Sequence, residues 1–141
     1  VTYTNSEGQT RPDAGARILV LPLQHPNVSR IAAGSFQSGA TSQDLKLAQA
    51  VIRTLGGDFA LVDATGKYTI QVANSGQYQL VILSRYQPRS EKQSTEEVAG
   101  FLHVWFDQPQ VLLGQTQFFR AEMGLDVQKS QSRDHSFPIA E

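Results

Sequence analysis

The chain has 141 residues, of which 40% are hydrophobic and 18% are charged, with a formal net charge of −1 and no cysteine. This length and composition fit one globular domain. The small net charge provides no general attraction to nucleic acid or anionic lipid, and the lack of cysteine excludes disulfides, thiolate metal sites and a cysteine nucleophile. No apolar run in the sequence reaches the roughly 18 residues of a membrane span, so we expect membrane contact only through an anchor outside this chain.

The first part of the chain predicts two strands. Residues 1–4 are rich in β-forming types, and residues 16–22 are a nearly continuous run of branched apolar side chains that ends at Pro22. Such a run is typical of a strand buried on both faces. Residues 23–40 are rich in Gly, Ser, Gln and Pro and have no clear period, which predicts an irregular loop.

A short amphipathic helix is predicted over residues 42–55. Thr41 and Asp44 have the spacing of a capping box, and Gly56 and Gly57 supply a stop signal. Apolar residues recur at three- and four-residue steps, as on one helical face: Leu45, Ala48, Val51, Ile52 and Leu55. We expect this helix to be an insertion that lies across one end or edge of a sandwich.

The segment from residue 58 to residue 86 predicts three strands joined by two tight turns. The predicted strands cover residues 59–62, 67–72 and 77–83, and Asp, Asn, Ser and Gly residues occupy the connections. In the middle strand, Tyr68, Ile70 and Val72 alternate with polar residues and share one face.

The C-terminal part predicts more mixed structure. A helix over residues 95–106 is favoured because Thr95 can cap it and two glutamates occupy its first turn. A strand over residues 101–106 is the competing interpretation. A helical turn over 108–114, a final strand over 116–127 and a polar tail over 129–141 follow.

Three short motifs appear in a characteristic order along this chain. They are the turn Arg11-Pro-Asp-Ala-Gly-Ala16 before an apolar strand, the turn Asp63-Ala-Thr-Gly66 before Lys67-Tyr-Thr-Ile70, and the strand start Gly76-Gln-Tyr-Gln-Leu80. Together they resemble a carboxypeptidase regulatory-like, or transthyretin-like, domain. The resemblance covers residues 1–22 and 58–86.

This resemblance implies a seven- or eight-strand Greek-key β-sandwich outside the cytoplasm, in the periplasm, the cell envelope or a secreted protein. It implies no catalytic residue. We therefore expect a mostly-β Greek-key sandwich that forms a single domain over residues 1–128. One or two short helices would be inserted near residues 42–55 and 95–114, and residues 129–141 would form the tail.

The best candidates for ligand binding are aromatic residues near the C-terminus, with one histidine beside them: His103, Trp105, Phe106, Phe118 and Phe119. The competing interpretation is a core lid, because large aromatic side chains dominate protein cores. Two or more exposed rings would favour a platform for a sugar or a peptide.

Evidence for catalysis is weak. No histidine pair has metal-ligand spacing, and Asp13, Asp58 and Asp63 fit backbone caps better than a calcium site. Transthyretin-like hydrolases end in Tyr-Arg-Gly-Ser, an order that residues 86–90 lack. We expect no metal and no cofactor.

The predicted function is thus a non-catalytic extracytoplasmic accessory or interaction module, with a protein or a glycan as its partner. The first alternative is a carbohydrate-binding module. The second is a small-molecule hydrolase on a transthyretin-like fold, which a cleft holding His103 beside an arginine would favour.

Overall fold

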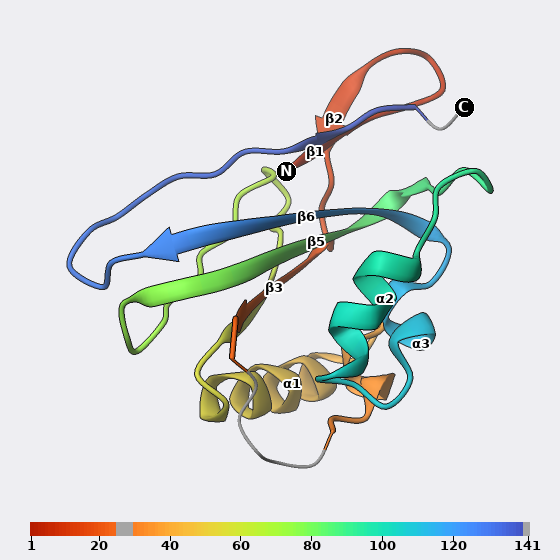
Figure 1. Ribbon diagram of the computed structural model, residues 1–141. Coiled ribbons are helices and arrows are strands. Elements are labelled where there is room, and N and C mark those ends of the chain that lie inside the picture. The colour runs from red at the N-terminus through yellow and green to blue at the C-terminus, as the bar shows by residue number, and fades with distance from the viewer. Residues whose placement is uncertain (25–29, 140–141) are drawn as a thin grey trace.

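The computed structural model describes residues 1–24 and 30–139, and over these residues the chain forms two β-sheets (Figure 1). The larger sheet has four antiparallel strands in the order β4-β3-β5-β6, which cover Asp58–Leu61, Arg17–Pro22, Gly76–Pro88 and Thr116–Leu125. The smaller sheet has three strands in the order β2-β1-β7, which cover Thr10–Pro12, Thr2–Thr4 and Ser136–Phe137. The protein is therefore mostly sheet, in two layers, as expected for a small β-sandwich.

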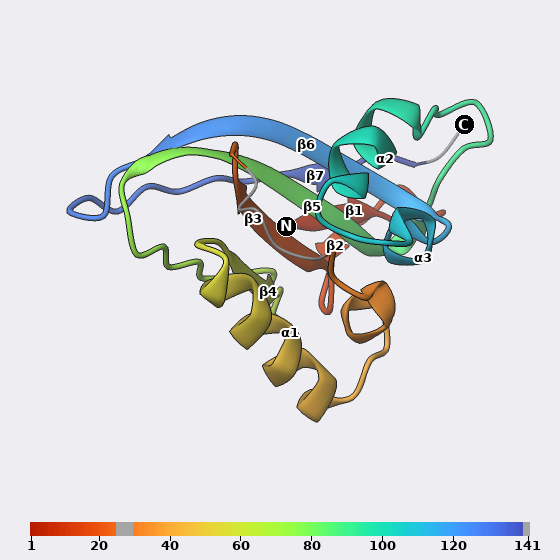
Figure 2. The ribbon, with the colours of Figure 1, turned by 60° about the horizontal axis from the view of Figure 1, so that its bottom comes forward.

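A third layer consists of short helices. Over the described residues these are the 3₁₀ helix η1 (Ala33–Phe36) and the α-helices α1 (Ser42–Thr54), α2 (Glu96–His103) and α3 (Pro109–Leu113). All of them lie on the face of the larger sheet that points away from β1, β2 and β7 (Figures 1 and 2). Within the described residues, no helix combines the length and apolar character needed to cross a membrane.

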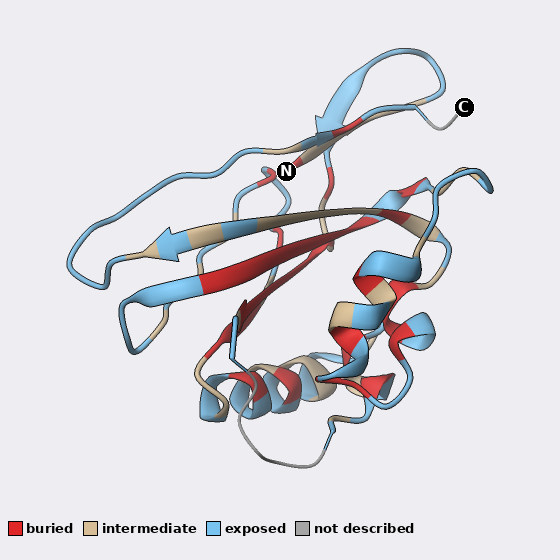
Figure 3. Cartoon of the chain, viewed as in Figure 1, coloured by how far each residue is buried: buried red, intermediate tan, exposed pale blue. Residues whose placement is uncertain are grey.

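The two central strands, β3 and β5, are buried on both faces (Figure 3). On β3, Leu19 and Leu21 pack with the helices, whereas Ile18 and Val20 pack with the smaller sheet. Because side chains alternate between the faces of a strand, a continuous apolar run needs cover on both sides. The sequence-based prediction of a buried strand at residues 16–22 is confirmed.

The prediction that residues 42–55 form a helix is confirmed, and the helix packs over one face of the larger sheet beside its edge strand β4. The predicted capping box is complete: Thr41 Oγ1 accepts the backbone N–H of Asp44 at 3.1 Å, and Asp44 Oδ2 accepts the backbone N–H of Thr41 at 3.3 Å. Ala48 and Ile52 of α1 lie in the same buried cluster as Leu19. The helix covers this face of the sheet together with η1, α2 and α3, and it packs mainly beside β4.

Residues 67–72 do not form the predicted strand, because no strand lies beside them. Burial still alternates along them: Tyr68, Ile70 and Val72 pack on the core, and the intervening residues are exposed. The segment is therefore extended, but the side chain of Asp58, not a neighbouring strand, makes the hydrogen bond to its backbone at Gln71. The two real strands of this region, β4 and β5, are not neighbours either, since β3 lies between them.

The C-terminal predictions have mixed outcomes. The helix over residues 95–106 is confirmed as far as His103, and the alternative strand over 101–106 is wrong. The expected polar tail contains β7, where Phe137 pairs with Tyr3 of β1 and is 1% exposed. A two-residue strand is too short to produce a periodic signal. Residues 25–29 of the predicted 23–40 loop, and residues 140–141 of the tail, lie outside the described residues.

Candidate ligand-binding groove

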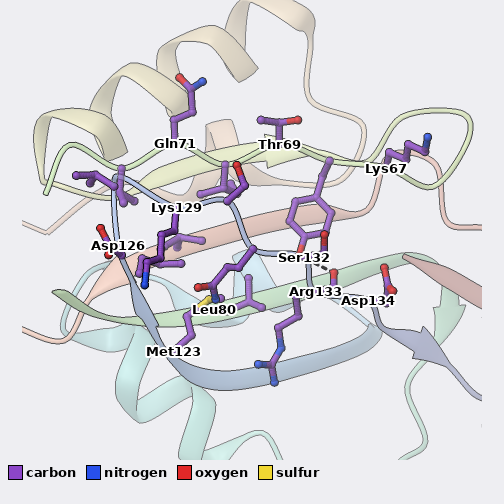
Figure 4. A pocket seen from close by; sticks show the side chains of 18 of the residues that line it. Lys67, Thr69, Gln71, Leu80, Met123, Asp126, Lys129, Ser132, Arg133 and Asp134 are labelled. Carbon is purple, nitrogen blue, oxygen red and sulfur yellow. Dashed lines mark hydrogen bonds between the residues drawn. The ribbon is translucent and has the colours of Figure 1, made fainter. Parts of the chain in front are cut away.

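An open groove of about 830 Å³ lies on the larger sheet, on the same face as the smaller sheet (Figure 4). Its floor is apolar: Met123 and Leu125 of β6 are half-buried there, and Val20 of β3 and Leu80 of β5, each 1% exposed, lie beneath. Its walls are residues 66–72 and residues 126–134 apart from Gln128, and both segments lie outside any helix or strand.

The groove exists because the two sheets differ in strand length. Strands β5 and β6 have 13 and 10 residues, whereas β1 and β2 have three each and β7 has two. At about 3.3 Å per residue, three residues span roughly 10 Å, so the smaller sheet covers only part of this face. The rest of the face lies between the two irregular segments.

The first wall is held by the carboxylate of Asp58, which is fully buried at the start of β4. Asp58 Oδ2 accepts the backbone N–H of Gln71 at 2.9 Å. Asp58 Oδ1 accepts the backbone N–H of Phe59 at 2.8 Å and Nε of Arg53 at 2.9 Å. A single side chain thus joins α1, β4 and the wall.

The second wall starts with a turn at Asp126. Ser75 Oγ accepts the backbone N–H of Val127 at 3.0 Å, which links the turn to the start of β5. Further along, the hydroxyl of Tyr68 donates to the backbone oxygen of Arg133 at 3.0 Å and so joins the two walls. Burial raises the pKa of the Tyr68 hydroxyl, which keeps this donor protonated.

The positive and negative charges of the side chains that line the groove nearly cancel. Lys67, Lys129 and Arg133 line it together with Asp126 and Asp134, so three positive groups face two negative ones. The guanidinium of Arg133 lies 5.6 Å from the ring centre of Phe119. All five residues are exposed, so salt and water screen their charges. The groove is polar at its walls without the concentrated positive charge of an anion site.

The groove combines an apolar floor with hydrogen-bonding walls, a combination that is common in ligand sites. Among the described residues that line it there is no histidine and no glutamate that could act as a base for its serines. Across the described chain, no three acidic or histidine side chains gather closely enough to hold a metal ion. The carboxylates of Asp13, Asp58 and Asp63 all accept backbone N–H groups, which confirms their prediction as caps.

The aromatic residues predicted as a binding site do not form one exposed surface. Trp105 and Phe106 are 1% and 0% exposed and lie in the core beneath the helices. Phe118 is half-buried on that same side, whereas Phe119 is half-buried on the opposite face of β6, where His135 stacks on it at 4.1 Å. The two phenylalanines separate because consecutive strand residues point to opposite faces. The core-lid interpretation therefore describes Trp105 and Phe106.

His103 lies apart from these rings and from the groove. It is exposed at the end of α2, with its Nε2 atom 2.9 Å from Nη1 of Arg30. The histidine and the arginine are thus adjacent, as the hydrolase interpretation would require, but neither lines the groove.

The sequence does not identify the residues of the groove as a site, for two different reasons. Residues 67–72 were recognised as extended, but nothing in a single sequence shows that an extended segment lacks a partner strand. Residues 129–134 are uniformly polar, and such a stretch looks like any solvated surface. Comparison with protein-family models, curated proteins and solved structures found no match to this chain.

Proposed function

We propose that this chain is a non-catalytic interaction module that binds its partner in the groove above Met123 and Leu125. The groove itself carries this proposal: its volume of about 830 Å³ lies within the range of roughly 300–1,000 Å³ that is usual for ligand sites. An apolar floor supplies contact area, and polar walls supply orientation. The fixed wall at Gln71 means that one side of the site exists before a ligand arrives.

The motif resemblance supports two finer parts of the proposal. A transthyretin-like Greek-key ancestry would account for the apolar strand after Gly15 and for the turn at Gly66. Such domains act outside the cytoplasm as accessory modules, so we place this protein in the periplasm, the cell envelope or the secreted fraction. Fractionation of cells that express the full gene, followed by immunodetection, tests that placement.

A pair of tryptophan variants tests the site. Ser132 lies on the groove wall and is exposed, so Ser132→Trp fills the groove without disturbing the core. Gln128 is exposed on the same segment but does not line the groove, so Gln128→Trp is the matched control. A phage library of 12-residue peptides and a panel of hexasaccharides (cellulose, chitin and xylan fragments) serve as probes.

We expect peptides that are retained by the parent chain and by Gln128→Trp but lost by Ser132→Trp. Titration of ¹⁵N-labelled protein with such a peptide should shift the amide signals of Thr69, Gln71 and Lys129. Shifts at the same residues with a hexasaccharide would instead establish the carbohydrate-binding alternative. If no probe distinguishes the two tryptophan variants, the groove is not the binding site and the proposal is wrong.

A further inference from the structure

We infer that the partner is an extended polypeptide segment that adds a β-strand along residues 68–72. This inference rests on the proposed function, because it assumes that the groove is the binding site. It concerns the chemistry of the ligand: backbone hydrogen bonds along one wall, and alternate apolar side chains on the floor. This is the recognition mode in which a peptide adds a strand to an open edge.

The direction of the backbone groups supports this inference. Alternating burial shows that residues 67–72 are extended. In an extended segment, the backbone N–H and C=O of residues two apart point to the same side. The N–H of Gln71 points toward Asp58 of β4. The backbone groups of Ile70 and Val72 must therefore point to the opposite side, away from β4.

The groups on that opposite side are unpaired. No other described residue makes a hydrogen bond to the backbone N–H or C=O of Tyr68, Ile70 or Val72. The same holds, within the described chain, for the backbone of residues 130–132 on the facing wall. Two rows of free donors and acceptors thus border one groove. Such rows are templates for pairing with another strand.

The spacing of these groups selects a polypeptide. Free backbone groups on one side of an extended chain recur about every 6.8 Å, which is twice the rise per residue of a strand. A partner strand presents its own groups at that interval, and it directs every second side chain to one face. In this groove that face is the floor, where the half-buried side chains of Met123 and Leu125 offer apolar contact. The expected ligand alternates apolar and polar residues over about five positions.

Hydrogen exchange provides the first test. The probe is a synthetic peptide selected from the 12-residue library as described above, added at saturating concentration to the full chain. Strand addition predicts that the amides of Ile70 and Val72 become at least about tenfold slower to exchange, since they gain partners. The amide of Thr69 points to the other side and should change little. Equal protection at all three positions, or at none, would overturn strand addition.

Backbone substitution provides the second test. Replacing Ile70 by its α-hydroxy analogue turns the amide into an ester, which removes the N–H and keeps the side chain. We expect peptide affinity to fall about fivefold for this variant and less than about twofold for the same replacement at Thr69. Because both variants keep every side chain, a difference between them cannot come from lost packing. Equal losses would contradict the inference.

These outcomes separate the inference from the proposed function. If no probe binds in the groove, the proposed function fails. If a hexasaccharide binds there, or a peptide binds without alternation between Thr69 and Ile70, the groove remains the site and only strand addition fails. A different result in sedimentation would be dimers that form with rising concentration and that the Ile70 ester weakens. That result would show that the partner is a second copy of this chain, and it would overturn a separate polypeptide partner.

Discussion

The carboxylate of Asp58 holds the backbone of Gln71 at 2.9 Å, in the place where a neighbouring strand would otherwise lie. One buried side chain thereby fixes an extended segment near the start of β4 while leaving the other edge of that segment open. The same carboxylate binds Phe59 and Arg53, so its loss would free three donors at once. The shape of the groove depends on this junction between a side chain and the backbone.

Replacement of Asp58 by Ala should therefore destabilise the protein and loosen the wall. We expect a loss of about 3 kcal/mol in the free energy of unfolding, because buried donors lose a charged acceptor. Urea titration followed by circular dichroism measures the loss, and faster exchange of the Gln71 amide locates it. Asp63→Ala is the control, since Asp63 is exposed and caps only its own turn. A loss no larger than that of the control would contradict the role given to Asp58.

Arg17 offers a second test, because its guanidinium is buried without a carboxylate partner among the described residues. It donates to the backbone oxygens of Phe36 at 2.9 Å and Leu112 at 2.6 Å, and so joins η1 and α3 to the sheet. Burial lowers its pKa to about 10. We expect Arg17→Met to cost about 2–3 kcal/mol in urea unfolding, since both carbonyls would be left buried and unpaired. The exposed Arg11→Met should change stability by less than about 0.5 kcal/mol.

Two glycines should respond in opposite directions to the same substitution. A Cβ atom at Gly57 would lie 2.1 Å from the backbone oxygen of Val20, so Gly57→Ala must displace the chain between α1 and β4. We expect a loss of about 3 kcal/mol. Gly100 lies within α2 with nothing within 4 Å of its Cβ position, so Gly100→Ala should stabilise by about 0.5–1 kcal/mol. Thermal unfolding of both variants checks the contrast, and a stable Gly57→Ala would refute the close approach.

The partly buried position of His135 predicts that the stability of the protein depends on pH. Its ring stacks on Phe119 and meets Phe137 edge-on, and burial lowers its pKa below the ordinary value of 6.5, with the charge of Arg133 acting in the same direction. At a pH between the pKa of His135 in the folded chain and its higher pKa in the unfolded chain, the unfolded chain binds one more proton than the folded chain. Stability is therefore fully present above about pH 6.5 and decreases as the pH falls below it.

Urea unfolding at pH 7.5 and pH 5.0 measures this effect. The difference in unfolding free energy between the two pH values should be smaller in His135→Gln than in the parent chain, because the variant lacks the group that titrates. Other titratable groups contribute to both proteins and cancel in the comparison. The same pH difference in both proteins would show that His135 does not titrate differently on folding.

Local structure was predictable where the signal was local. The Thr41–Asp44 pair marks the start of α1 and Gly56 marks its end. Both signals can be read from the sequence because caps and stops depend on neighbours a few residues away. The apolar run around Leu19 likewise indicated burial on both faces. The aromatic site was not predictable: Trp105 and Phe119 look equally suited to a surface or a core until the faces they occupy are known.

The sequence by itself determined where α1 begins and ends, that the segments of β3 and β5 are strands, and that both lie in the interior. Tertiary structure alone decided that the helices lie on one face of the larger sheet, that β7 pairs with β1, and that residues 67–72 have no strand beside them. The physical reason is that a periodic pattern records how far each side chain is buried. It does not record which groups bind the backbone: Tyr68, Ile70 and Val72 alternate in burial whether a strand or the carboxylate of Asp58 holds the segment.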